Sequence, residues 1–332
     1  MSEKENPPSA TRSQVSFREV DAGSDGQRID NYLQRELPGV PKGRIYRMLR
    51  KGEVRVNKGR VKPADRLKQG DTVRIPPVSV ATRDTPQVPR HLTERLRDAV
   101  IFEDKTLVVI NKPGGIAVHG GSGLSFGVVE AMRTLQPDWQ DLALVHRLDR
   151  ETSGALVLAK KRSTLRRLHE AFREDRVSKV YKAMVDGYWP HGGTVIDAPL
   201  SVRERRGGER HVMVTADGKP SRTRVEPLEC RRYASLLMLY PETGRTHQIR
   251  VHLAHMGHPI VGDERYGEEA RNKELAAEGL PRLFLHAQSI AFDDGVGGEQ
   301  IFSAPLPSDL SQFEDAILAK PTVSEERRGR RR

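Results

Sequence analysis

A segment with three prolines and little periodicity, PVSVATRDTPQVPRH at residues 77–91, divides this chain into two parts. Proline interrupts helices and is excluded from central strands, so neither part can extend regular structure through this segment. We predict a linker there, a small domain at 16–76 before it and a larger domain at 92–320 after it. The polar segment 1–15 and the arginine-rich tail 321–332 are expected to be disordered.

The positive charge of the chain is concentrated in the small domain. The whole chain carries a net charge of +11, to which residues 16–76 contribute +7, with 15 basic and 8 acidic residues. Residues 322–332 add +3, and the long stretch 77–321 adds only +1. Solubility alone does not require charge to be clustered in this way. The segregation indicates a polyanionic partner for the small domain.

Two short amphipathic helices and small strands are predicted for the small domain. Residues 27–36 and 41–51 each place apolar side chains on one face, and Gly52 ends the second helix. Residues 53–57 and 71–75 have the composition of short strands. The second helix leaves a row of cations on its outer face. These cations are Lys42, Arg44, Arg47, Arg50 and Lys51.

The larger domain mixes strands and helices without a regular βαβ repeat. This pattern predicts an α+β fold with a mixed, largely antiparallel sheet flanked by helices and loops. Ser163 is the expected N-cap of one of the helices. The predicted strands are 106–111, 154–160, 178–185 and 234–240, and the predicted helices are 163–173 and 246–256.

Composition also narrows the class of protein. The chain has one cysteine, so an intramolecular disulfide is excluded. No apolar run approaches the roughly 20 residues that a membrane-spanning helix needs, and the first residues do not resemble a signal peptide. We therefore expect a cytoplasmic protein without a membrane partner.

The stretch VHRLDRETSG at residues 145–154 encloses one carboxylate, Asp149, between two arginines. A second arginine pair lies in TGRTHQIR at 243–250. A guanidinium stabilises the ionised form of a carboxylate and fixes its orientation, which suits nucleophilic or electrostatic catalysis. The same pattern also fits a structural ion pair, and the residues alone leave both interpretations open. The arginines of the two segments are Arg147, Arg150, Arg245 and Arg250.

Three further features have a chemical and a structural interpretation. His247, His252, His255 and His258 suggest zinc, but their spacing lacks the usual i, i+4 pair with a third ligand, and hydrogen-bonded polar histidines are favoured. The glycine-rich KPGG and HGGSG match neither phosphate-loop pattern, so no nucleotide cofactor is expected. Tyr181, in a predicted strand among lysines, suits either base stacking or cross-strand packing.

Taken together, three motifs resemble those of the RluA-type RNA pseudouridine synthases. They are HRLDRETSG at 146–154, SKVYKAMV at 178–185 and TGRTHQIRVH at 243–252. The small domain, with RIDNYL at 28–33 and RKGEVRVN at 50–57, is similar to an S4 RNA-binding domain. The resemblance implies a pseudouridine synthase fold behind an S4-like domain.

The resemblance also implies a reaction and roles for individual residues. A uridine in RNA is isomerised to pseudouridine without cofactor, metal or energy source. Asp149 matches the essential aspartate, which attacks C1′ of the ribose or removes a 2′ proton. Arg250 matches the arginine paired with it, and Tyr181 matches the tyrosine that stacks on the base and serves as a late general base. Arg147 and Arg245 also match motif positions, and their charge suits them to steer phosphates or to pin the loop.

The similarity extends from about residue 17 to about residue 318 and is strongest toward members that modify large-subunit ribosomal RNA. It implies 23S rRNA, or the precursor of the large ribosomal subunit, as the partner, and we expect a monomer. Three alternatives remain. The first is a large-subunit pseudouridine synthase of the D type, which has other target uridines. The others are a non-catalytic ribosome-assembly RNA-binding protein and a metal-dependent RNA hydrolase that uses the histidines.

Overall fold

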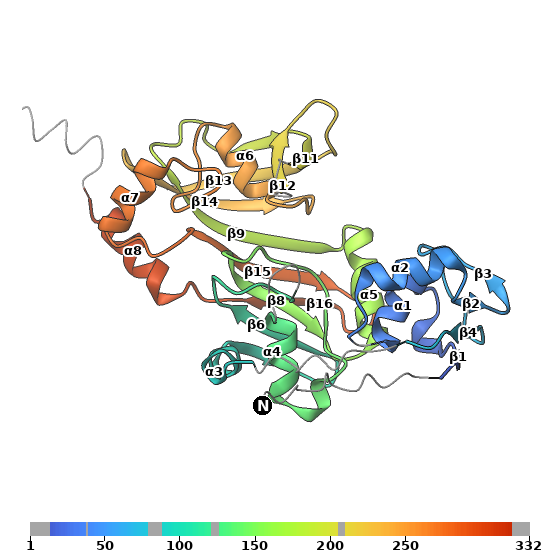
Figure 1. Ribbon diagram of the computed structural model, residues 1–332. Coiled ribbons are helices and arrows are strands. Elements are labelled where there is room, and N and C mark those ends of the chain that lie inside the picture. Colours follow the sequence, from blue (N-terminus) through green and yellow to red (C-terminus); the bar gives the residue numbers. More distant parts are fainter. Residues whose placement is uncertain (1–13, 38, 79–87, 121–125, 205–209, 321–332) are drawn as a thin grey trace, which may run out of the picture. The chain divides into compact units, whose positions relative to one another are not determined.

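The computed structural model of the protein describes residues 14–37, 39–78, 88–120, 126–204 and 210–320 (Figure 1). The contacts between Cα atoms divide the chain into two compact units, Met1–Gln87 and Val88–Arg332. We call their described parts the front unit and the large unit.

Several predictions fall on residues outside the described ranges. The predicted disordered start, residues 1–15, is described only at its last two residues. The predicted linker lacks a description at 79–87, and the glycine-rich HGGSG at 121–123. The whole predicted tail, 321–332, also lies outside the described part of the chain.

The front unit contains the two predicted helices and a small antiparallel sheet with strand order β1-β4-β2-β3. Ile29 and Leu33 of the first helix and Ile45 and Met48 of the second are fully buried in one core, as their spacing predicted. Gly52 ends the second helix in the left-handed conformation, with φ of 69°. The elements are β1 (Ser16–Glu19), α1 (Ile29–Glu36), α2 (Lys42–Lys51), β2 (Arg55–Val56), β3 (Gly59–Arg60) and β4 (Thr72–Ile75).

The predicted row of cations on α2 lies on the exposed side of that helix. Each of the five side chains is exposed, while the opposite side of α2 packs into the core of the front unit. The front unit therefore presents a positively charged helix surface. Its members are Lys42, Arg44, Arg47, Arg50 and Lys51.

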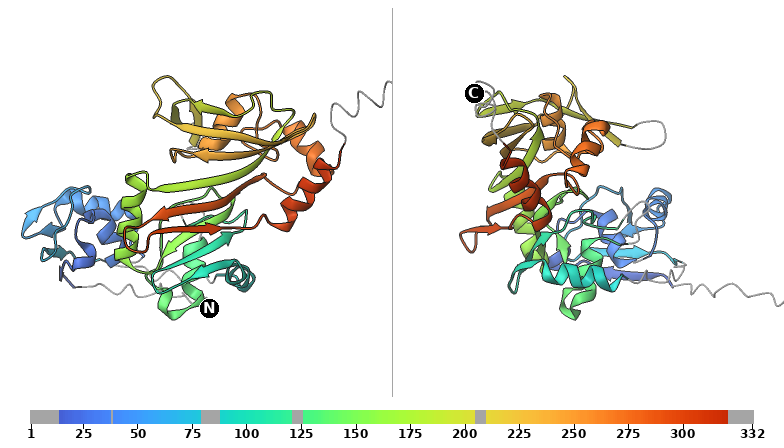
Figure 2. Two further views of the ribbon diagram at one scale, coloured as in Figure 1. Left: turned by 180° about the vertical axis from the view of Figure 1, so that it is seen from behind. Right: turned by 90° about the vertical axis from the view of Figure 1, so that its left-hand side faces the viewer.

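The large unit is built on one ten-stranded sheet (Figure 2). Its main path is β10-β13-β14-β9-β15-β8-β6-β5, with β16 paired to β15 and β7 paired to β8. Within the described residues all of its pairs are antiparallel except β15 with β8. The prediction of a mixed, largely antiparallel sheet with helices is confirmed. The strands are β5 (Val100–Glu103), β6 (Leu107–Lys112), β7 (Ala143–Leu144), β8 (Ser153–Ala159), β9 (Val177–Asp186), β10 (Thr194–Asp197), β13 (Arg222–Cys230), β14 (Ala234–Pro241), β15 (Leu285–Asp293) and β16 (Glu299–Ser303).

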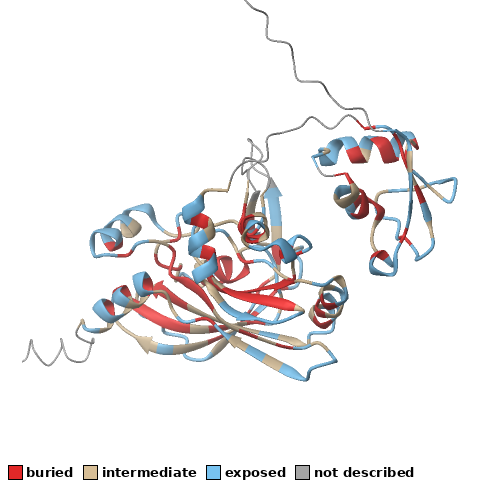
Figure 3. Ribbon diagram, turned by 90° about the horizontal axis from the view of Figure 1, so that it is seen from below, coloured by how far each residue is buried: buried red, intermediate tan, exposed pale blue. Residues whose placement is uncertain are grey.

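Helices flank this sheet, and burial follows its central strands (Figure 3). All seven residues of β8 are buried, which agrees with the apolar run that follows Ser153 and Gly154. None of the described helices has the length and apolar composition to cross a membrane. The remaining elements are α3 (Arg90–Asp98), α4 (Val128–Leu135), α5 (Arg162–Arg173), α6 (Gln248–His255), α7 (Glu269–Ala277), α8 (Ser308–Leu318) and the hairpin β11 (Leu200–Glu204) with β12 (Arg210–Val214).

Gly154 fixes the point at which three strands of the sheet meet. It pairs with Lys112 of β6 on one side and with Ala287 of β15 on the other. Its φ is 116°, and a Cβ built there would lie 2.2 Å from the carbonyl oxygen of Ala287. Only glycine fits both constraints. The loop that carries Asp149 enters β8 immediately before this point.

Two details of the predicted helices are wrong. Ser163 is not an N-cap, because α5 begins one residue earlier, at Arg162, and its N-cap Lys161 makes no side-chain cap. The helix predicted at 246–256 is shorter, Gln248–His255. His247 adopts a left-handed conformation, with φ of 53°, so the helix cannot extend back through it.

Candidate active site

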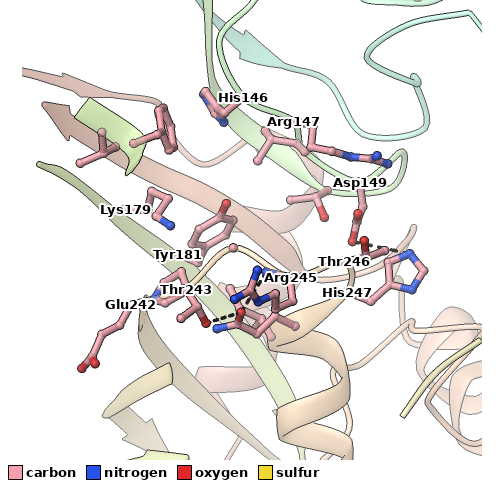
Figure 4. Close-up of a pocket in the computed structure, with 18 of the residues that line it drawn as sticks. His146, Arg147, Asp149, Lys179, Tyr181, Glu242, Thr243, Arg245, Thr246 and His247 are labelled. Carbon is pink, nitrogen blue, oxygen red and sulfur yellow. Dashed lines mark hydrogen bonds and ion pairs between the residues drawn. The ribbon is translucent and has the colours of Figure 1, made fainter. Parts of the chain in front are cut away.

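A pocket of about 640 Å³ opens in the large unit where several segments of the chain converge (Figure 4). They include the loop before β8, the end of α5, the start of β9 and the loop that leads into α6. The volume lies in the usual range of ligand pockets. All five residues predicted for the site from the three sequence motifs line it. They are Arg147, Asp149, Tyr181, Arg245 and Arg250.

The loop that carries Asp149 is held by backbone hydrogen bonds on both sides. The N–H of Thr152 donates to the carbonyl of Asp149 over 3.2 Å. The carbonyl of Arg150 accepts from the N–H of Gly115 over 2.9 Å, and the Arg150 guanidinium donates back to the Gly115 carbonyl over 3.0 Å. The turn after β6 and the Asp149 loop are therefore fastened together.

Lys112 also stabilises the junction between the turn after β6 and the Asp149 loop. Its side chain is completely buried, and its ammonium donates to the carbonyls of Pro113, Ile116 and Arg150 over 2.8, 2.9 and 3.1 Å. Burial lowers the pKa of Lys112 to about 7. Three carbonyl acceptors match the three donors of the charged ammonium. Lys112 was not singled out in the sequence, because nothing in a strand-ending lysine shows that it points inward.

Arg250 contacts two carboxylates. Its Nε and Nη2 each donate to Asp263 over 2.7 Å, a bidentate pair in which both side chains are buried. Its Nη1 lies 3.7 Å from Oδ2 of Asp149. Although burial opposes the charged form, the hydrogen bonds and charge of Asp263 raise the pKa of Arg250 further. The expected partner of Arg250, Asp149, is thus its longer contact, and Asp263 is the shorter one.

Asp263 is the functional-site residue that sequence reasoning missed. Besides Arg250, it accepts hydrogen bonds from the N–H groups of Arg265 and Tyr266, over 2.9 and 3.1 Å. The available signal was weak: a single carboxylate that follows the buried pair Ile260–Val261 and a glycine with positive φ, Gly262. Only the tertiary structure brings it to Arg250.

His247 lies on the other side of Asp149. Its Nε2 is 3.9 Å from Oδ2 of Asp149, and Figure 4 shows the two side chains directed toward each other. Its Nδ1 lies 2.8 Å from the hydroxyl of Tyr266. Burial lowers the pKa of His247, while the charge of Asp149 opposes this shift. The carboxylate of Asp149 thus faces one permanent cation and one imidazole.

Tyr181 lies in the pocket between the two largest apolar clusters of the large unit. Its partly buried ring packs against both of them. Burial raises the pKa of Tyr181, and the negative charge of Asp149 raises it further. The phenol is therefore neutral over the physiological pH range.

The loop before α6 is tied down by Gln248. Its amide nitrogen donates to the carbonyl of Arg222 and to the hydroxyl of Thr223. Its amide oxygen accepts from the Thr243 hydroxyl over 2.7 Å and from the N–H of Arg245 over 3.0 Å. These hydrogen bonds fix the conformation of residues 243–247, the part of TGRTHQIR that precedes α6.

The two remaining motif arginines lie at the exposed part of the pocket. Arg147 and Arg245 line the pocket with exposed side chains, and Arg245 donates to the carbonyl of Pro220 over 3.3 Å. The predicted cations of α2 belong to the front unit and are not among the residues that line this pocket.

The histidines of the segment 247–258 make separate contacts. His252 is buried, with Nδ1 2.9 Å from the Thr223 hydroxyl and Nε2 3.0 Å from the Ala198 carbonyl. His258 contacts the carbonyl of Asp186. Within the described ranges, no group of three or more His, Cys, Asp or Glu side chains is placed to hold a metal ion.

Comparisons with known proteins agree with this geometry. The S4 domain profile matches residues 27–73, and the RNA pseudouridylate synthase profile matches residues 106–255. The chain is 52% identical over 295 residues to the ribosomal large subunit pseudouridine synthase C of Pasteurella multocida, covering 88% of this chain and 90% of that protein. The chain belongs to the RNA pseudouridylate synthase family. It is therefore an enzyme of the isomerase class with an S4 domain.

Two further relatives of this pseudouridine synthase extend the comparison. The protein of the same name from Yersinia pestis is 51% identical over 307 residues, covering 92% of this chain and 96% of that protein. Among solved structures, human RNA Pseudouridylate Synthase Domain Containing 4 matches with a TM-score of 0.57 and 27% identity, covering 70% of this chain and 97% of that one. The likeness thus includes the catalytic fold as well as the sequence.

Proposed function

We propose that this enzyme isomerises specific uridines of 23S rRNA to pseudouridine, with Asp149 as the residue that acts on the ribose. One observation carries the assignment. The carboxylate of Asp149, with 19% of its side chain exposed, lies in the pocket 3.7 Å from Arg250 and next to Tyr181. An ionised, oriented carboxylate suits either nucleophilic attack at C1′ or removal of the 2′ proton.

The proposed reaction is an isomerisation in which atoms balance. The bond between N1 and C1′ breaks, and the detached uracil rotates in the pocket. A bond between C5 and C1′ then forms, C5 loses its proton, and N1 gains one. Arg250 would orient the carboxylate of Asp149 through these steps.

Tyr181 is proposed to stack on the base of an everted uridine. Turning a nucleotide out of a helix costs a few kcal/mol, and stacking on an aromatic ring returns about 1–3 kcal/mol per base. The raised pKa of Tyr181 favours the neutral phenol, which suits stacking. The raised pKa also means that Tyr181 could act as the proposed late general base only if a stronger base first took the proton from its hydroxyl group.

The front unit is proposed to hold the ribosomal RNA by its phosphates. Relatives that share about half of the sequence are named as ribosomal large subunit enzymes. The exposed cations of α2 provide the charge for contacts that position RNA without reading its sequence. The arginines Arg147 and Arg245 at the pocket are proposed to contact phosphates next to the target nucleotide.

Chemical tagging of pseudouridine in 23S rRNA, after incubation with the protein, tests the proposal. We expect new tagged positions with the wild-type protein, and the same positions should be missing from rRNA of a strain that lacks it. An rRNA that is bound but unmodified would support a ribosome-assembly protein instead. Tagged positions that differ from those modified by the relatives named pseudouridine synthase C would indicate the specificity of a D-type large-subunit enzyme. Strand cleavage abolished by a chelator would favour a metal-dependent hydrolase.

A further inference from the structure

The pocket also has lining residues beyond Tyr181, on the side away from Asp149, and we call this part of the pocket the second lobe. The lobe is formed by the end of α5, the start of β9 and the residue that precedes Arg147. It contains two cations, the exposed Arg173 and the more buried Lys179, and the reaction proposed above uses neither. The residues of this lobe are His146, Phe172, Arg173, Asp175, Val177 and Lys179.

Lys179 and Tyr181 are two residues apart on β9, so their side chains leave the strand on the same face. Figure 4 shows Lys179 next to Tyr181, on the side of the ring remote from Asp149. The electrostatics agree with this order, because the charge of Asp149 acts on Tyr181, whereas Asp175 is the carboxylate that acts on Lys179. Asp149, Tyr181 and Lys179 thus follow one another along the pocket.

The side chain of Lys179 is only partly exposed. In the parts of the chain that the structure describes, it makes no hydrogen bond or close ion pair. Its neighbour His146 offers no acceptor, because its Nε2 already accepts the N–H of Val157 over 3.1 Å. Burial lowers the pKa of Lys179, so a ligand that supplied an acceptor would compensate for the missing water.

The geometry of uracil fits this arrangement. If C1′ lies at Asp149 and the ring stacks on Tyr181, the atom of the base farthest from the ribose is the one opposite N1. That atom is C4, which carries the carbonyl oxygen O4. An ammonium has donors only, so it favours a carbonyl there and disfavours the amino group that cytosine carries at the same position.

We propose that Lys179 donates a hydrogen bond to O4 of the everted uracil and thereby selects uridine over cytidine. This inference rests on the function proposed above. Rotation of the detached uracil about its N3–C6 axis exchanges N1 with C5 and C4 with C2. The oxygen that faces Lys179 is then O2 instead of O4. Lys179 can therefore donate a hydrogen bond to the base both before and after the rotation, while Asp149 and Arg250 act at the ribose.

The test compares uridine with 4-thiouridine at the target position of a short 23S rRNA stem-loop. Sulfur is a weak acceptor, so the wild-type enzyme should process the thio RNA more slowly. Lys179→Met should lower kcat/KM on the uridine RNA about ten- to hundredfold, the usual range for removal of a charge-assisted hydrogen bond. The same variant should show little further decrease on the thio RNA, because the interaction is already missing. Lys179→Arg should recover part of the activity.

Lys105→Met removes one exposed lysine outside the pocket and serves as the charge-matched control. Equal rates of the wild-type enzyme on both RNAs would overturn the inference, whether or not Lys179→Met folds. The inference would also be overturned if the sulfur slowed the wild type and Lys179→Met by the same factor and RNA binding by Lys179→Met depended less on salt. That result would place Lys179 on a phosphate. Absence of pseudouridine from the wild-type reaction with uridine RNA would overturn the proposed function itself, a result distinct from both.

Discussion

Arg250 is shared unequally between two carboxylates, with two hydrogen bonds of 2.7 Å to Asp263 and a contact of 3.7 Å to Asp149. The buried Asp263 fixes the plane of the guanidinium, so only Nη1 is directed at Asp149. Because its bidentate pair is with Asp263, Arg250 makes only the longer contact with Asp149, and we infer that this leaves the Asp149 carboxylate accessible to a substrate. This arrangement leads to the first prediction.

Arg250→Ala should lose most activity and destabilise the enzyme, because it leaves the buried carboxylate of Asp263 unpaired. The cost of breaking such a pair is about 3–5 kcal/mol. The double variant Arg250→Met with Asp263→Asn should recover much of that stability but not the activity. Urea unfolding and a pseudouridine assay measure the two effects. Asp186→Asn, which breaks the more exposed pair with Arg271, is the control and should cost less than about 1 kcal/mol. Full activity in the double variant would remove Arg250 from the mechanism.

Asp149→Asn should bind RNA with nearly the affinity of the wild type and form no detectable product. The amide keeps the size of the side chain but is a poor nucleophile and a poor base. Fluorescence anisotropy with a labelled rRNA fragment measures binding, and tagging of pseudouridine measures turnover. Measurable turnover by this variant would assign the chemistry to another group.

The stability of the enzyme should fall between pH 6.5 and pH 3, in part through His146. Burial lowers the pKa of His146 to about 3, whereas an unfolded histidine has its ordinary value near 6.5. The unfolded chain therefore binds a proton in this range that the folded protein does not, and unfolding becomes easier as the pH falls. At pH 5 the effect is at most about 2 kcal/mol. His146→Gln should reduce the destabilisation between pH 7 and pH 5 by about this amount in urea unfolding; an unchanged destabilisation would show that His146 protonates in the folded state.

Replacing three cations of α2 should weaken RNA binding without harming the pocket. Arg44→Gln, Arg47→Gln and Arg50→Gln together should make the dependence of log Kd on log salt concentration shallower, by about one for each phosphate that is no longer neutralised. The turnover rate at saturating RNA should change little, because these side chains lie in the front unit. Lys105→Gln removes one exposed cation from the large unit and is the control for the change in slope per cation. Unchanged affinity of the triple variant would place the RNA anchor elsewhere.

The parts of the fold that follow from local sequence could be predicted. The spacing of Ile29 and Leu33, and of Ile45 and Met48, is that of a helix with one buried face, and those faces are buried. The apolar run at 154–160 predicted a buried strand, and β8 differs from it by one residue at each end. The motif residues Asp149, Tyr181 and Arg250, separated by up to 101 positions, line one pocket.

The parts that depend on tertiary contacts could not be predicted. Asp263 and Lys112 look like ordinary charged residues in the sequence, and only burial against specific partners gives them a function. Ser163 has the chemistry of an N-cap, but the chain enters α5 one residue earlier and that preference is overridden. The late start of α6 depends on the side chain of Gln248, which binds the preceding loop instead of leaving it helical.

Gly154 has a consequence for how this enzyme could be altered. Because β6 and β15 both pair at this residue and its positive φ excludes a side chain, β8 cannot slide along its neighbours. The segment of chain between that junction and the carboxylate of Asp149 therefore has a fixed number of residues, five positions along the sequence. Inserting or deleting one residue in it should abolish turnover even in a protein that still folds. Attempts to redirect the enzyme to new RNAs are best made outside residues 149–154.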